Sequence, residues 1–179
     1  MPEIEIRPAV MADWSQIIRL DHDYQSDYVW QMDRISDDGQ INISFREIRL
    51  PRPMNVEYPR TREWQVKDWG QEPGLLVAVL QGQVAGYISI KENDETRTAW
   101  VSDIVVDEPL RRKGIGSALL IAGQDWAVQR HLYRMVLEMQ SKNHPMINLA
   151  RKLGFELAGY HDQYFPNRDI ALFFACFLK

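Results

Sequence analysis

The sequence predicts an α/β (α+β) fold in which helices flank a mixed, mostly antiparallel central sheet. Three apolar runs separated by polar turns indicate an antiparallel meander between residues 75 and 106. A glycine-containing turn and an amphipathic stretch follow. A further apolar run at 133–140 then returns parallel to the last strand of the meander, by the right-handed crossover rule. With 179 residues, of which 45% are hydrophobic, we expect one domain that spans 1–179.

The N-terminal segment is expected to form a short strand and then a helix. Glu3 to Arg7 alternates charged and apolar residues, as a half-buried strand does. Asp13 suits a helix N-cap, and Trp14 and Ile17 follow a helical spacing. We therefore expect a helix that ends near Asp23.

A β-hairpin is expected next. Val29 to Ile35 and Ile41 to Leu50 are extended runs, and the Asp-Gly pair within Ser36 to Gly39 suits the turn between them. Regular structure should then be interrupted by three prolines, Pro51, Pro53 and Pro59. Thr61 to Trp69 is expected to form a short helix.

The meander and the elements after it are the most regular part of the chain. Its strands are expected at Leu75 to Leu80, Val84 to Lys91 and Thr98 to Val106. A helix follows, because apolar residues recur with helical spacing at Ile115, Ala118, Leu119, Ala122 and Trp126. Tyr133 to Gln140 alternates as the next strand.

The turn that opens this helix has the features of a phosphate site. Gly114 and Gly116 let backbone N–H groups approach a bulky anion, and the first helical turn supplies unpaired donors and the positive end of the dipole. Arg111, Arg112 and Lys113 add positive charge. We expect a pyrophosphate to bind the backbone of Arg112 to Ser117.

Two segments resemble one family. Arg111 to Gly116 reads R-x-x-G-x-G, which resembles the acyl-CoA pyrophosphate loop of the GNAT superfamily of N-acetyltransferases. Asn143 to Phe155 resembles that superfamily's later element, in which an Asn opens a short helix that ends in Leu-Gly-Phe, and Tyr164 to Phe174 is similar to streptothricin-type acetyltransferases. The resemblance covers about Leu75 to Phe155. It implies acetyl-CoA as cosubstrate and a parallel pair of central strands that splay at the cofactor site.

The resemblance also assigns cofactor contacts. It implies that the backbone of Ile104 to Val106 pairs with the pantetheine arm and polarises the thioester carbonyl. Asn143 matches the residue that hydrogen-bonds the pantetheine, and it suits a helix cap equally well. The expected cofactor-binding residues are Ile104, Val105, Val106, Arg111, Arg112, Lys113, Gly114, Ile115, Gly116, Ser117 and Asn143.

Acetyl transfer to an amine also needs a base, and two carboxylates are candidates. Asp103 and Glu138 each lie within an apolar central strand, where an unpaired charge is costly. Glu138 is favoured as the base because alternation turns it away from the bulkier side chains, and Asp103 equally suits an anchor for the acceptor ammonium. The alternative is that these carboxylates form ion pairs, for example with Arg97 or Arg134, or are exposed at a sheet edge.

One position departs from the family pattern. GNAT enzymes commonly carry a Tyr five residues before the Phe of Gly-Phe, where it protonates the departing CoA thiolate, and here that position is Ala150. A positioned acid contributes about 10²–10⁴-fold, but a thiol with a pKa of about 8.5 also leaves as the thiolate. Tyr160 and Tyr164 are candidate replacements, or they are packing residues.

Composition limits the function classes. The net charge of −4 argues against a nucleic-acid partner, and the chain has neither an apolar run long enough for a membrane span nor a signal pattern at its start, so we expect a cytoplasmic protein. Cys176 is expected to be a buried structural thiol, and the four histidines are too far apart in sequence to suggest a metal site. Acidic residues gather in the first forty positions, as solvated faces or as an acidic wall: Asp21, Asp23, Asp27, Asp37 and Asp38.

The sequence therefore predicts an acetyl-CoA-dependent N-acetyltransferase that acts on a primary amine of a small cationic molecule, by direct transfer in a ternary complex. The alternatives are a protein lysine or N-terminal acetyltransferase and a non-catalytic acyl-CoA-binding module. Tyr28, Trp30 and Tyr58 would either line an aromatic acceptor pocket or belong to the core. The expected partners are acetyl-CoA and an amine acceptor, and a homodimer is left open.

Overall fold

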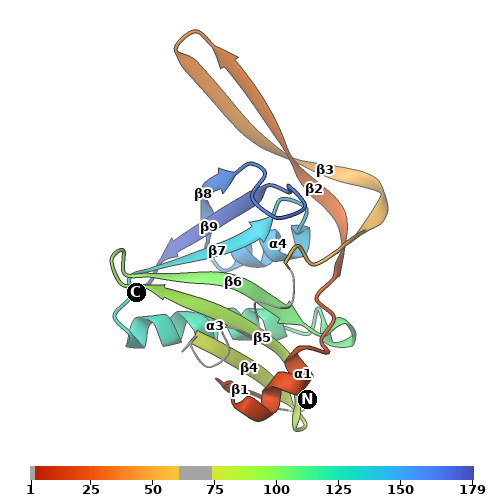
Figure 1. Ribbon diagram of the computed structural model, residues 1–179, viewed down its shortest axis with the longest axis vertical. Coiled ribbons are helices and arrows are strands. Elements are labelled where there is room, and N and C mark those ends of the chain that lie inside the picture. The colour runs from red at the N-terminus through yellow and green to blue at the C-terminus, as the bar shows by residue number, and fades with distance from the viewer. Residues whose placement is uncertain (1–2, 61–73) are drawn as a thin grey trace.

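A computed structural model describes residues 3–60 and 74–179 (Figure 1). A seven-stranded sheet lies at the centre, in the order β1-β4-β5-β6-β7-β9-β8, and every neighbouring pair is antiparallel except β6 and β7. Its strands are β1 (Ile4–Pro8), β4 (Gly74–Leu80), β5 (Gln83–Asn93), β6 (Thr98–Val106), β7 (Arg134–Gln140), β8 (Glu156–His161) and β9 (Ala171–Phe177). The predicted mixed, mostly antiparallel sheet flanked by helices is confirmed.

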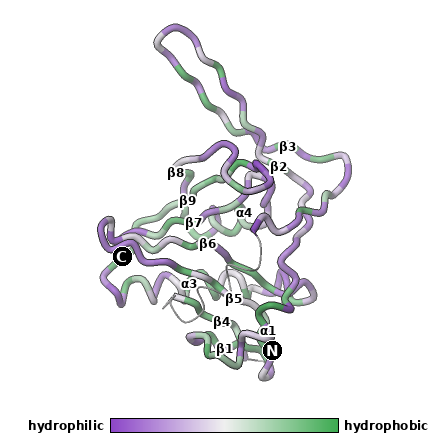
Figure 2. The backbone as a smooth tube through the Cα atoms, viewed as in Figure 1, coloured by the Kyte–Doolittle hydropathy of each residue, from purple (hydrophilic) through white to green (hydrophobic). Residues whose placement is uncertain are grey.

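Helices cover the sheet unequally. The long helix α3 (Ile115–Gln129) and α4 (His144–Lys152) pack on one face, and the short α1 (Trp14–Ile17) covers the other (Figure 1). The main core lies between α3, α4 and the sheet, and Figure 2 shows hydrophobic residues along the strands that meet α3. Within the described ranges, no helix is long and apolar enough to cross a membrane.

The parallel pair of strands separates partway along its length. β6 and β7 pair only from Thr98 opposite Arg134 to Val101 opposite Leu137. The register between β5 and β6 then shifts, because Ser102 is an extra residue that forms a β-bulge. Beyond this point the two strands part, as expected, and Asp103 and Glu138 lie where the opening begins.

The hairpin β2 (Tyr24–Asp37) and β3 (Gln40–Val56) projects from the body as a long two-stranded arm (Figure 1). Both strands are longer than expected, and the prediction that Pro51 and Pro53 interrupt regular structure is wrong, because β3 continues through them. The register explains why. Ser26 pairs with Met54 and Tyr28 pairs with Arg49, so Leu50 to Pro53 form a bulge without partner residues on β2. A proline there removes no ladder hydrogen bond.

The N-terminal helix is also shorter than predicted, because a 3₁₀ turn (Met11–Asp13) leads into a single helical turn that ends at Ile17. Asp13 occupies the N-cap position, as predicted, but its side chain makes no capping hydrogen bond to this helical turn. Its carboxylate instead accepts from the Val10 N–H at 2.8 Å and pairs with the Arg7 guanidinium. The short helix expected at Thr61 to Trp69 lies outside the described residues.

Candidate active site

One cavity of about 640 Å³ is lined by most of the site residues that were predicted from the sequence. It extends from the glycine turn at the start of α3, past the outer half of β6, to the carboxylates at the β6–β7 opening. The nominated residues that line it are Asp103, Ile104, Val105, Val106, Arg111, Arg112, Gly114, Ile115, Gly116, Ser117, Glu138 and Asn143. Lys113 is exposed and is not among the lining residues.

The glycine turn has the backbone that a phosphate site requires. Gly114 is the N-cap of α3 with φ +88°, a left-handed conformation that favours glycine. A Cβ at Gly116 would lie 3.4 Å from Leu149 Cδ2, so the helix start is closely packed on this side. Gly114 to Ser117 line the cavity, so the N–H groups that a first helical turn leaves without intrahelical partners lie at the cavity wall.

Arg111 does more than add charge to this turn. Its Nε donates to the Val106 carbonyl at 2.8 Å, and Nη2 donates to the Asp21 carbonyl at 2.6 Å. The guanidinium thus fixes the turn to the end of β6 and to the segment that leads into β2. Arg112, in contrast, is exposed and lines the cavity.

Asn143 has one of the two roles that the sequence left open for it, that of a helix cap. Its Oδ1 accepts from the Met146 N–H at 3.1 Å, which makes it the N-cap of α4. The residue also lines the cavity, so its amide nitrogen remains available for a ligand.

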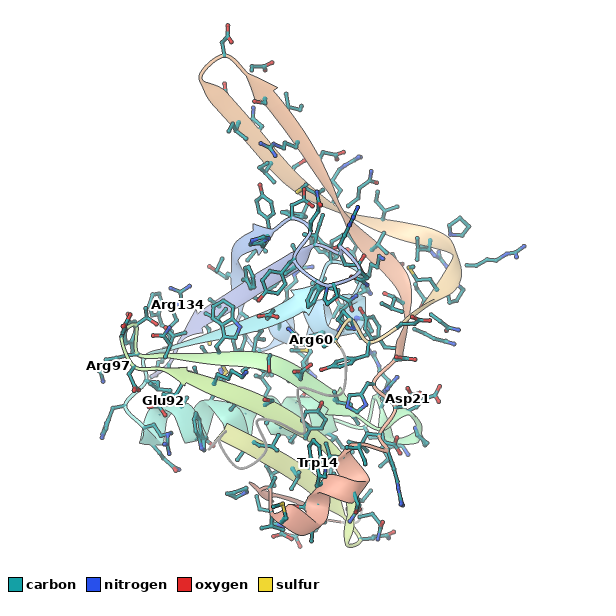
Figure 3. The ribbon with its side chains drawn as sticks, viewed as in Figure 1. Trp14, Asp21, Arg60, Glu92, Arg97 and Arg134 are labelled. Carbon is teal, nitrogen blue, oxygen red and sulfur yellow. The ribbon has the colours of Figure 1, made fainter. Side chains whose placement is uncertain are left out.

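The two carboxylates are buried and share one cation. Arg60, which follows β3, donates to Oδ1 of Asp103 at 3.2 Å and to Oε1 of Glu138. The expected ion-pair partners are wrong: Arg97 donates to the His131 carbonyl, and Figure 3 places Arg97 and Arg134 at the far end of the sheet from Arg60. Arg134 begins β7, four residues before Glu138, so it lies at the closed end of the parallel pair.

The rest of the hydrogen bonding differs between the two acids. Oε2 of Glu138 accepts from Trp100 Nε1 at 2.7 Å and from the Tyr164 hydroxyl at 3.0 Å. Oδ1 of Asp103 accepts from the Tyr58 hydroxyl at 2.7 Å, but its Oδ2 is buried with no hydrogen-bond partner among the described residues. Both oxygens of Glu138 accept hydrogen bonds, whereas Oδ2 of Asp103 accepts none from the described residues.

Two phenols near Asp103 act as neutral donors. Burial, and then the Asp103 charge, raise the pKa of Tyr58, and burial raises the pKa of Tyr87 well above its usual value. Tyr87 contacts Nε2 of His22 at 3.1 Å, and His22 also lines the cavity. A further phenol, Tyr24, donates to Gln140 Oε1 at 2.7 Å, and burial raises its pKa as well.

The remaining aromatic candidates divide between site and packing. Tyr58 lines the cavity, whereas the Tyr28 ring packs at a tilt against His144 and Trp30 packs against the main core. Of the two tyrosines proposed to replace the missing acid, Tyr164 contacts Glu138, and Tyr160 packs edge-on against Phe45. Ala150 itself is fully buried in the main core.

Cys176 is half-buried rather than fully buried. It packs against the main core, and burial raises the pKa of its thiol, which fits the structural role expected for it. In residues 3–60 and 74–179, no group of three His, Cys, Asp or Glu side chains is arranged to hold a metal ion.

Several residues of the site carry no sequence signal. Arg60 follows a proline in an irregular segment, and His22 stands alone between a helix and a strand. The tertiary structure brings them to Asp103 and Tyr87 across 43 and 65 positions. The one available signal was indirect: a carboxylate within an apolar strand, such as Asp103, needs a cation from elsewhere in the chain.

Comparison with known proteins gives one family. Residues 43–155 match the Acetyltransferase (GNAT) family. The streptothricin acetyltransferase of Streptomyces lavendulae is 27% identical over 160 residues, which cover 87% of this chain and 82% of that protein.

Two solved structures share the fold over nearly their full length. The crystal structure of nourseothricin acetyltransferase superposes with a TM-score of 0.83 and 24% identity, covering 98% of this chain and 99% of that one. A putative streptothricin acetyltransferase from Bacillus anthracis str. Ames, in complex with acetyl coenzyme A, gives a TM-score of 0.76 and 19% identity, with coverage of 98% and 99%.

Proposed function

We propose that this chain, which belongs to the Acetyltransferase (GNAT) family, transfers the acetyl group of acetyl-CoA to a primary amine of a small cationic molecule. The family makes the chain an acetyl-CoA-dependent acetyltransferase, and the acceptor is the part that we infer. The inference rests on one observation: Asp103, which lines the cavity that begins at the glycine turn, keeps a buried carboxylate oxygen, Oδ2, without a hydrogen-bond partner among the described residues.

The residues present suit acetyl-CoA at the other end of the cavity. Backbone N–H groups at the start of α3 would hold the pyrophosphate, and Arg112 adds a positive charge beside them. The outer part of β6, Ile104 to Val106, no longer pairs with β7 and lines the cavity. Its backbone, together with the Asn143 amide, would hold the pantetheine arm.

The acceptor end has the chemistry of an ammonium site. A protonated amine cannot attack a thioester until it loses a proton, so a nearby carboxylate must first orient it and then accept that proton, directly or through water. Oδ2 of Asp103 has no partner among the described residues, whereas both oxygens of Glu138 already accept from Arg60, Trp100 and Tyr164. We therefore assign proton removal to Asp103 and the organisation of the site to Glu138. This reverses the preference expected from strand alternation.

Similarity to proteins that are named as acetyltransferases of streptothricin and nourseothricin supports a small amine acceptor. Because one cavity contains both ends, we infer direct transfer in a ternary complex, without an acyl-enzyme. Departure of CoA as the thiolate is compatible with Ala150, since a thiol is a tolerable leaving group at neutral pH.

The test is thiol release from acetyl-CoA across a panel of small amines and of peptides with free N-termini or lysines. We expect turnover with at least one small amine, and a loss of about 10²–10⁴-fold in Asp103→Asn with acetyl-CoA affinity unchanged. Glu92→Gln is the matched control, because Glu92 lies on the neighbouring strand and pairs with Arg130 away from the cavity. Turnover on peptides alone would favour a protein acetyltransferase, and no turnover despite acetyl-CoA binding would favour a non-catalytic module.

A further inference from the structure

Arg60, which is labelled in Figure 3, lines the cavity together with Asp103 and Glu138 and forms an ion pair with each of these carboxylates. Besides Asp103 and Glu138, its guanidinium contacts the Ser102 carbonyl at 3.1 Å and lies 5.2 Å above the centre of the Phe165 ring. Its side chain is 20% exposed, whereas the side chains of both carboxylates are 4% exposed. It is a half-buried counter-ion on the wall of the cavity.

The charges in this group do not balance. Asp103 and Glu138 provide two negative charges against the one positive charge of Arg60. Oδ2 of Asp103 is the atom left without a hydrogen-bond partner among the described residues, although its residue is more than nine-tenths buried and lines the cavity. A buried charged oxygen needs a donor, and a single ammonium group supplies both the donor and the missing charge.

An incoming acceptor is not expected to displace Arg60. Its guanidinium makes four contacts, from two strands, a bulge carbonyl and an aromatic face. Removing one partner of a buried ion pair leaves the remaining charge uncompensated, which is strongly unfavourable. Arg60 therefore stays in place while the acceptor binds.

From this geometry we propose that Arg60 determines the charge of the acceptor, by restricting the site to one ammonium group at Oδ2 of Asp103. A second cationic group close to the reacting amine would be repelled by the Arg60 guanidinium. An acceptor with several cationic groups must therefore carry the others far from the reacting amine. The inference rests on the proposed function and deepens it, because it specifies how the charges of the acceptor are spaced.

Removing the guanidinium should reverse this preference. In Arg60→Gln, Asp103 and Glu138 face the cavity with two negative charges and no internal cation, which favours two adjacent ammonium groups. Arg60→Lys keeps the charge and is the matched control, although it loses the forked geometry. Two amines of equal length serve as probes, 3-amino-1-propanol with one ammonium group and 1,3-diaminopropane with two.

The measurement is calorimetric binding of both amines to the CoA-bound protein, with circular dichroism to verify folding. We expect wild type and Arg60→Lys to bind the diamine no better than the monoamine, and Arg60→Gln to bind the diamine at least tenfold better. The same ratio in wild type and folded Arg60→Gln, or no binding of either amine to any of the proteins, would overturn the proposal.

Two further results keep the test decisive. If Arg60→Gln does not fold, Glu138→Gln removes one of the two negative charges instead; we then expect at least tenfold weaker monoamine binding, and unchanged binding would refute the charge balance. Acetyl transfer is measured separately. If the protein transfers acetyl but Arg60→Gln leaves the ratio of diamine to monoamine affinity unchanged, only the inference about Arg60 is wrong. If that ratio changes but no acetyl is transferred, the inference about Arg60 is supported and the proposed function is wrong.

Discussion

Gly116 provides the sharpest test of the cofactor site, because a side chain there changes the cavity more than the fold. The residue lines the cavity at the start of α3, and an added Cβ would lie 3.4 Å from Leu149 Cδ2 and 3.9 Å from Val106 Cγ2. A methyl group is therefore tolerated with a small adjustment, whereas we expect the two larger branches of valine to intrude on the cavity that this residue lines. Gly116→Val should displace a bound phosphate from at least one backbone N–H.

The expected magnitude follows from that one lost contact. A hydrogen bond to a charged group contributes about 1.5–3 kcal/mol, so the Kd for acetyl-CoA should rise by a factor of roughly 10 to 150. Titration calorimetry measures the affinity, and circular dichroism and the melting temperature verify the fold. A folded Gly116→Val that binds acetyl-CoA as tightly as wild type would show that the phosphates bind elsewhere.

Gly114 is the less specific position, although it belongs to the same turn. No atom lies within 4 Å of a Cβ added there, but its φ of +88° makes any L side chain strained. Gly114→Ala should cost about 1–2 kcal/mol of stability, which lowers the melting temperature by about 2–8 °C in a chain of this size. A double substitution of both glycines would mix this strain with the loss of the phosphate site.

Three other predictions concern the acids and the packing of the sheet. Glu138→Gln should lower the acetylation rate more than it weakens acetyl-CoA binding, yet by less than Asp103→Asn does; steady-state kinetics that rank the two variants the other way would make Glu138 the base. Arg7 holds the pKa of Asp13 below its usual 3.8, so the stability that the carboxylate adds is complete above about pH 5 and is lost as the pH falls through 3.8 and below. Denaturant titrations should therefore find wild type more stable than Asp13→Asn at pH 7 and the difference shrinking in acid, and a difference independent of pH would contradict this. Gly86→Ala should cost about 1–3 kcal/mol, because its Cβ would lie 2.5 Å from the Val105 carbonyl oxygen, and a melting temperature equal to that of wild type would mean that β5 and β6 separate easily.

The regular elements were predictable from the sequence because their signals are local. Strand alternation and helical spacing located β4 to β7 and α3 to within a few residues, since each pattern reports burial on a sheet or helix face. The short N-terminal helix was overestimated because Trp14 and Ile17 satisfy a helical spacing within a single turn. The continuation of β3 through Pro51 and Pro53 depends on a bulge in the pairing with β2, and no local pattern reveals which residues lack a partner.

The site divides in the same way. The glycine turn was predicted because its backbone requirement leaves a readable spacing, and Asn143 was predicted from the family resemblance; both line one cavity. Asp103 and Glu138 were identified because charge within an apolar strand is unusual. Arg60 was not identified from the sequence, because its contacts depend on the path of the segment after β3 back to the sheet. Those contacts join residues more than forty positions apart.

The two bonds of Arg111 tie together regions that would otherwise respond to different ligands. One guanidinium contacts the end of β6 and the Asp21 backbone, three residues before β2 begins with Tyr24, a residue of the acceptor side of the cavity. These hydrogen bonds connect the phosphate turn to the segment before β2, and we predict that a displacement of one shifts the other. Thermodynamic reciprocity then applies. If bound acetyl-CoA raises the affinity for the acceptor by some factor, bound acceptor must raise the affinity for acetyl-CoA by the same factor. Cutting this link, as in Arg111→Met, should uncouple the two affinities before it abolishes either one.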